Sequence, residues 1–324
     1  VNGDLTVSGG LLRIEGGTTF ANAHLIGGSL GFAPGYVLTG TIFFEGAGGS
    51  VVMNGTAGTL TIGPTGSIKT VAGLTGNCFI GGGGQGAMTL VNQGLISAEA
   101  SFNTLFVRPE NLTNTGTISV NSGSTLNLLG SASWSNTGTL RVAGGTLNLL
   151  FTLTTAFLNL PGFVRTGGTV SLLGDLDNNG STLALADDFN VNNTALIIGG
   201  TISTAGTARL QVNGGRLQGV TLAGVASVNS NSVAKGGLTL NGGQLIVNAG
   251  RKLTFQAGNQ ALTGNGTVLF AGTGSSLEVE ANRRLTLGAG VIIVATTGTN
   301  RLIASASGAS GVIDSIISTA PGAT

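Results

Sequence analysis

Short apolar segments recur along this chain about every eight residues, and that rhythm constrains the fold more than any other feature. The segments are plainest from Gly237 onward, where each has apolar residues two positions apart, as in Leu238-Thr-Leu240 and Leu253-Thr-Phe255. Such alternation places one set of side chains on a single face of a β-strand. Gly and Asn separate the segments, as in Asn241-Gly-Gly243, and both tolerate the backbone of a tight turn. The pattern predicts many short strands joined by turns.

The spacing between the segments narrows the choice of sheet. A βαβ crossover needs a dozen or more residues, so the gaps are too short for one. Two architectures are left: an antiparallel meander, with hairpins at Asn213-Gly214 and Asn241-Gly242, or a solenoid with two or three short strands in each coil. Uniform spacing over the whole chain favours the solenoid. Only Leu150 to Leu160 is long and apolar enough to suggest a helix.

We therefore predict an all-β fold, a single right-handed parallel β-helix (β-solenoid) of about 13 coils that covers residues 1–324. Three strands in a coil of about 24 residues, stacked about 4.8 Å apart, would give a rod of about 60–65 Å. Leu, Val, Ile and Phe are expected in ladders inside, and Thr, Ser and Asn outside. Most of the 13 Phe lie in apolar strand contexts and are expected in the core.

Composition supports a packed solenoid and argues against some partners. Only 8% of the residues are charged, but 41% are hydrophobic, which is enough apolar surface for a long core. The net charge is +1 and the basic residues are scattered, so we expect no nucleic acid partner. The single cysteine, Cys78, allows no intramolecular disulfide and is expected to be a small buried residue.

A longer repeat is also visible, because residues 237–290 echo residues 3–66. Asp4-Leu-Thr-Val-Ser-Gly-Gly10, for example, matches Gly237-Leu-Thr-Leu-Asn-Gly-Gly243. The echo indicates either tandem modules in a parent protein or a structure whose ends continue one another. The chain begins at Val1 with neither Met nor a signal peptide, as expected of a segment of a longer precursor.

Three segments carry a resemblance to known repeats. They are Asn111-Leu-Thr-Asn-Thr-Gly-Thr-Ile-Ser-Val120, Ser135-Asn-Thr-Gly-Thr-Leu140 and the stretch from Phe163 to Leu185. These segments resemble the repeats of large bacterial surface proteins, the autotransporter-passenger-like and haemagglutinin-like β-helix proteins. The resemblance covers nearly the whole chain, and it implies export, a β-helix and a role in adhesion or surface structure.

One segment has the spacing of a calcium site. Asp175-Leu-Asp177-Asn-Asn179-Gly180 matches the first half of a calcium loop of the EF-hand type. Oxygen ligands from Asp175, Asp177 and Asn179 at alternate positions, followed by Gly, would suit Ca²⁺. The twelfth position is Ala186, however, where that loop has a bidentate Glu. The alternative is a β-turn in which Asp and Asn bond to their own backbone.

Two further motifs give little support for chemistry. Gly81-Gly-Gly-Gly-Gln-Gly86 lacks the Lys-Ser/Thr and the helix of a phosphate-binding loop, and it is expected to form a turn or bulged loop. His24, the single histidine, has no nucleophile motif near it and is expected to be structural.

Carboxylate pairs are the features closest to a sugar-cleaving site. Asp175 with Asp177, and Glu278 with Glu280, have the spacing to share a strand face, as paired acid and base groups require. Sugar clefts also need aromatic platforms, yet the chain has one Trp and one Tyr. We therefore expect no enzymatic activity.

The expected function is that of a non-enzymatic extracellular or cell-surface protein with a structural or adhesive role. It would be a stalk, or a filament subunit that binds itself end to end in a homopolymer; neighbouring modules of a longer chain are the other partners that would cover its ends. Glycans are a further candidate partner. We expect no transmembrane helix, because no run of 18 or more apolar residues occurs. The alternative is a carbohydrate-binding or polysaccharide-cleaving β-helix protein. Apart from calcium at residues 175–179, we expect no cofactor.

Overall fold

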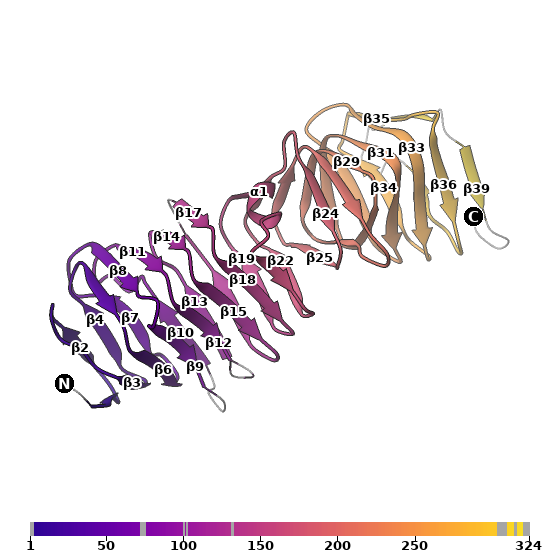
Figure 1. Cartoon of the computed structure of the whole chain (residues 1–324). Helices are drawn as coiled ribbons and strands as arrows, with labels where there is room; N and C mark the ends of the chain where they lie inside the picture. Colours follow the sequence, from indigo (N-terminus) through magenta and orange to yellow (C-terminus); the bar gives the residue numbers. More distant parts are fainter. Residues whose placement is uncertain are drawn as a thin grey trace. The chain divides into compact units, whose positions relative to one another are not determined.

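The computed structural model describes residues 3–71, 76–99, 101, 103–130, 133–302, 310–313 and 316–319. The chain is an all-β parallel β-solenoid of about 13 turns, as predicted (Figure 1). Neighbouring strands of successive coils pair in parallel, so the antiparallel alternative is wrong. Asn213-Gly214 and Asn241-Gly242 lie at corners of the solenoid and form no hairpin.

The chain divides into two compact units. The first comprises Val1–Phe151 and Leu160–Val170, and the second comprises Thr152–Asn159 and Ser171–Thr324. Each unit is described by itself below.

The first unit consists of three parallel sheets. The first sheet holds, in order, β1 (Leu5–Val7), β3 (Asn22–Ile26), β6 (Thr41–Gly46), β9 (Ser67–Thr70), β12 (Leu95–Ala98), β15 (Thr117–Asn121), β18 (Thr139–Ala143) and β21 (Phe163–Arg165). The second sheet holds β2 (Leu11–Ile14), β4 (Ser29–Phe32), β7 (Ser50–Met53), β10 (Gly76–Ile80), β13 (Asn103–Val107), β16 (Thr125–Leu128) and β19 (Thr146–Leu149). The third sheet holds β5 (Tyr36–Leu38), β8 (Gly58–Ile62), β11 (Met88–Asn92), β14 (Asn111–Asn114) and β17 (Ser133–Asn136).

The second unit repeats this arrangement, with three long strands that turn corners. Those strands are β29 (Arg216–Leu222), β31 (Ser232–Asn248) and β33 (Gln260–Ala271). They join three rows of shorter strands. One row holds β20 (Leu153–Thr154), β23 (Asp175–Asp177), β26 (Leu196–Ile198), β32 (Lys252–Gln256), β34 (Ser276–Val279) and β37 (Arg301–Leu302). Another holds β24 (Thr182–Leu185), β27 (Thr201–Thr204), β35 (Arg284–Leu287) and β38 (Ser310–Ile313). The last holds β22 (Thr169–Leu172), which spans the boundary, β25 (Phe189–Asn192), β28 (Leu210–Asn213), β30 (Val225–Ser230), β36 (Val291–Ala295) and β39 (Ile316–Thr319).

The core of each unit lies inside its coils and is built from ladders of apolar side chains. One ladder of the first unit occupies equivalent positions of the second sheet, and all its members are fully buried: Leu30, Val51, Ile80, Val107, Leu128 and Leu149. Alternation along each strand therefore decides which side chains face outward.

Coils differ in length, and the difference appears at their corners. Ser29, Ser50, Phe79, Phe106 and Asn127 occupy equivalent positions of successive coils, so coils of 21, 29, 27 and 21 residues follow one another. One long corner is the loop of residues 81–87 between β10 and β11, beside the second sheet.

Helix is confined to one turn. Among the described residues the only helix is α1 (Thr155–Leu158), which lies inside the stretch that the sequence singled out. Among all the residues that the structure describes, no helix has the length and apolar character needed to cross a membrane.

Candidate functional site

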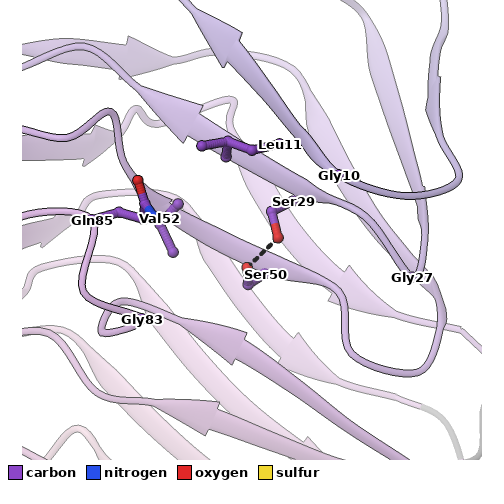
Figure 2. A pocket seen from close by; sticks show the side chains of 8 residues that line it. All are labelled: Gly10, Leu11, Gly27, Ser29, Ser50, Val52, Gly83 and Gln85. Atoms are coloured by element: carbon purple, nitrogen blue, oxygen red, sulfur yellow. Dashed lines mark hydrogen bonds between the residues drawn. The ribbon is translucent and has the colours of Figure 1, made fainter.

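A groove lies on the outer face of the second sheet of the first unit. It has a volume of about 400 Å³, and we call it the serine groove (Figure 2). Its lining residues are Gly10, Leu11, Gly27, Ser29, Ser50, Val52, Gly83 and Gln85. They come from four successive coils of the solenoid.

The floor of the serine groove is a pair of hydroxyl groups. Ser29 of β4 and Ser50 of β7 pair in register, and their Oγ atoms are 2.6 Å apart (Figure 2). Both side chains face outward because their neighbours Leu30 and Val51 are buried in the core. Leu11 precedes the serines in the same row and has a larger side chain, so the serines form a depression in the sheet surface.

One wall of the groove is the glycine loop between β10 and β11. Five of its glycines have positive φ angles that other residues rarely adopt: Gly81 (81°), Gly82 (76°), Gly83 (81°), Gly84 (70°) and Gly86 (99°). The expected loop is thus confirmed, and its backbone explains the run of glycines. The amide nitrogen of Gly55 donates to the carbonyl oxygen of Gln85 at 2.9 Å, which ties the loop to the preceding coil. The side-chain amide of Gln85 makes no hydrogen bond with any described residue.

Two stacked phenylalanines continue the row of the serines. Phe79 pairs in register with Ser50, and Phe106 pairs with Phe79. Their ring centroids are 5.2 Å apart, with 23° between the planes. Arg108 lies with its guanidinium carbon 4.3 Å from the centroid of Phe79, and its Nε donates to the carbonyl oxygen of Gly81 at 3.1 Å. We call Phe79, Phe106 and Arg108 the aromatic cluster; cation–π attraction and the hydrogen bond hold Arg108 against the glycine loop.

The groove and the cluster together offer hydrogen bonds, apolar contact and one guanidinium, that of Arg108. The side chains that line the groove itself are two hydroxyls, one amide and the alkyl groups of Leu11 and Val52, and none of these is ionisable. Such a lining can bind a ligand through hydrogen bonds and apolar contact.

The residues predicted for calcium lie in the second unit. Asp175 and Asp177 share the outer face of β23, because Leu176 between them is buried. Asp175 Oδ1 accepts from the backbone of Leu196 at 3.2 Å, whereas Asp177 Oδ1 accepts from the backbone and the side-chain amide of Asn179 at 3.0 and 2.8 Å. The structure therefore brings Asp177 and Asn179 together as a hydrogen-bonded turn. Calcium binding by these three residues stays a prediction.

The other predicted carboxylates have structural partners. Glu278 accepts from Lys252 Nζ at 2.9 Å and from Ser276 Oγ at 3.2 Å, and Glu280 accepts from the backbone of Ala257 at 3.2 Å. No group of three or more His, Cys, Asp or Glu side chains in the described part of the chain is placed to hold a metal ion.

His24 lies between carboxylates of neighbouring coils. Its Nδ1 is 2.8 Å from Glu45 Oε1, its Nε2 is 3.9 Å from Asp4 Oδ2, and its ring stacks on Phe43. These contacts link three coils of the first sheet, which fits the expected structural role.

The single Tyr and the single Trp form no aromatic platform on the outer surface. Tyr36 is buried and donates its hydroxyl to the carbonyl oxygen of Thr18 at 2.7 Å, and Trp134 stacks on the buried Phe151. The expected core position does not hold for Phe43, Phe79 and Phe106, each of which lies between two buried neighbours and faces outward. The signal was present, since Phe79 alternates with two residues that are buried, Cys78 and Ile80.

Comparison with protein-family models, with curated proteins and with solved structures found no match to the chain.

Proposed function

We propose that this chain is a structural and adhesive segment of an extracellular or cell-surface protein, a stalk or a filament subunit, and not an enzyme. The observation that carries this proposal is the set of side-chain ladders that connect one coil to the next. Such ladders add bonds between coils to those of the backbone, and they stiffen a stack whose work is to hold its shape.

An interior ladder of amides connects three coils of the first unit. Asn92 Nδ2 donates to Asn114 Oδ1 at 2.6 Å, and Asn114 Nδ2 donates to Asn136 Oδ1 at 2.7 Å. All three side chains are buried. A hydrogen bond between buried side-chain amides stabilises the fold more than one exposed to water, because losing it leaves an unpaired polar group in the core.

A second ladder lies on the outer face of the second unit. Asn213 donates to Asn192 at 2.9 Å, Asn229 donates to Asn213 at 2.9 Å, and Asn248 donates to Asn229 at 2.5 Å. This row is polar but uncharged. Rows of this kind present repeated weak hydrogen-bonding groups, and repetition can turn weak contacts into adhesion through multivalency.

The resemblance to autotransporter-passenger-like and haemagglutinin-like repeats supports export and a place at the cell surface. We also propose a right-handed coil, because parallel strands joined by crossovers are right-handed in nearly all cases. The partner at the ends is either another copy of the chain or a neighbouring module.

An assay of reducing-sugar release separates this proposal from a polysaccharide-cleaving function. The purified chain would be incubated with homogalacturonan, xylan and a soluble β-glucan. We expect no release above the buffer control. Release proportional to protein concentration, and lost in the Asp175→Asn/Asp177→Asn or the Glu278→Gln/Glu280→Gln double variant, would contradict the proposal and favour the lytic alternative.

A further inference from the structure

We infer that the serine groove and the aromatic cluster form a binding site for a neutral glycan chain. The inference rests on the adhesive part of the proposed function and deepens it, because it names the class of ligand that the segment would bind. The site lies entirely within the first unit.

The hydroxyl pair has unused hydrogen-bonding capacity. Two serine hydroxyls carry two protons, and one is spent between Ser29 and Ser50. One proton and several lone pairs remain at the floor of the groove. A hydroxyl of a sugar can donate and accept at the same time, so it suits a floor that does both.

The side-chain amide of Gln85 completes the polar set. It has a planar carbonyl and amino group and no hydrogen bond with a described residue, while the backbone of the same residue is fixed by Gly55. A planar amide on a fixed backbone can bond two adjacent hydroxyls of one sugar ring. The positive φ angles of the loop glycines turn the backbone so that Gln85 reaches the groove.

The apolar parts of the site match the apolar face of a pyranose ring. Leu11 and Val52 line the groove, and Phe79 follows Ser50 in the same row. Sugar rings have axial C–H groups that pack on alkyl and aromatic side chains. The stack of Phe106 and Arg108 on Phe79 restrains the ring, so little side-chain entropy is lost on binding.

The repeat of the solenoid favours an extended chain over a single sugar. Ser29, Ser50 and Phe79 lie in successive coils, about 4.8 Å apart, close to the length of one hexose unit in an extended polymer. Successive sugars would therefore meet the two hydroxyls and then the aromatic cluster. No residue that lines the groove carries a charge, and Nε of Arg108 already donates to the loop, so the groove itself offers the polar contacts of a neutral ligand.

Isothermal titration of the purified full chain tests this site. The probes are hexasaccharides of β-1,4-linked glucose, xylose and mannose, with a galacturonate hexasaccharide as the charged comparison. We expect the chain to bind at least one neutral probe. Ser50→Val and Gln85→Ala should each weaken that binding about tenfold, since each removes polar contacts made in the complex. Phe79→Leu keeps an apolar side chain and should also weaken binding.

Ser135→Val is the matched control. Ser135 Oγ also bonds to a hydroxyl of the neighbouring coil, that of Thr113 at 3.3 Å, but in the third sheet of the same unit. The Ser135→Val variant should bind the neutral probe with the affinity of the unaltered chain. Absence of binding to every neutral probe, equal losses in Ser50→Val and Ser135→Val, or tighter binding of the galacturonate probe would each overturn the inference. Cleavage of a bound neutral probe would contradict the structural proposal and leave the binding site standing.

Discussion

At the scale of single residues, the buried amides show how a polar side chain stabilises a solenoid core. Asn114 uses its whole amide: its oxygen accepts from Asn92, and its nitrogen donates to Asn136 and to the carbonyl oxygen of Thr139 at 3.2 Å. The oxygen of Asn92 and the nitrogen of Asn136, at the two ends of the ladder, have no partner among the described residues. Asn114 is therefore the residue on which the ladder depends most.

Asn114→Ala should destabilise the first unit by about 2–4 kcal/mol, because it leaves Asn136 Oδ1 without its donor and Asn92 Nδ2 without its amide acceptor. Asn148→Ala is the control: Asn148 Nδ2 donates to Asn127 Oδ1 at 2.7 Å, but both side chains are half-exposed. The control should lose only about 0.5–1 kcal/mol, since water replaces the lost bond. Urea unfolding followed by fluorescence of Trp134, on the same strand as Asn136, measures both. Equal losses of free energy of unfolding in the two variants would show that the buried ladder stabilises the chain no more than the exposed pair does.

Because of Cys78, the chain should become less stable at alkaline pH. The thiol is fully buried, and burial raises its pKa. A backbone hydrogen bond from Gly49 opposes part of that rise, and the resulting pKa is about 11, against an ordinary value of 9.0. Between these values the folded chain keeps a proton that the unfolded chain has lost, so the free energy of unfolding falls as pH rises through the window.

Between these pH values the free energy of unfolding should fall more steeply with pH than it does in Cys78→Ala, which has no thiol to titrate. The difference in slope should reach up to about 1.4 kcal/mol per pH unit. Urea unfolding of both proteins at several pH values between about 9 and 11 checks this. Other groups titrate equally in both proteins and cancel in the difference. Parallel curves for the two proteins would rule out the thiol as the source.

At the scale of elements, the corners of the coils limit which residues can occupy them. Gly94, Gly116 and Gly138 occupy one corner of three successive coils, each following the buried asparagines by two positions. A Cβ added at Gly116 would overlap the carbonyl oxygen of Gly94, and one at Gly138 would overlap that of Gly116. The oxygen of Gly94 cannot move freely, because it accepts from the amide of Thr117 at 2.8 Å.

Gly116→Ala should therefore destabilise the chain by about 2–3 kcal/mol through backbone displacement. Gly16→Ala is the control, since a Cβ there meets nothing within 4 Å and the residue has no positive φ. It should be neutral or stabilise by a few tenths of a kcal/mol, because alanine reduces the entropy of the unfolded chain. Thermal unfolding followed by circular dichroism compares the two. A loss of stability in Gly16→Ala as large as in Gly116→Ala would contradict the close-packed corner.

The sequence predicted the elements better than it predicted the contacts between them. Alternation found the strands, and the left-handed glycines of residues 81–86 were recognisable as a loop. The interior asparagines could not be recognised, because Asn with Gly two positions later suggests a turn. Asn92 and Asn114 also meet across 22 residues of chain. The serine groove had no local signal either, since it joins four coils of unequal length. The echo between residues 237–290 and 3–66 stays a prediction, either of tandem modules or of a structure whose ends continue one another.

At the scale of the whole molecule, each coil pairs with the coils before and after it, so stability in each unit accumulates from one coil to the next. Such a scaffold can carry side chains on its outer rows without disturbing its core. The polar ladder of the second unit and the serine groove of the first are both placed on such rows. We therefore expect variants on the outer rows to change binding more than folding.

Electron cryomicroscopy of the purified chain at native salt tests whether the chain is a structural segment made of stacked coils. We expect particles with layers about 4.8 Å apart. Fibres with this spacing would assign the filament role, and single layered particles would assign the stalk. Particles without the layer spacing would contradict the stacked coils and the structural role built on them.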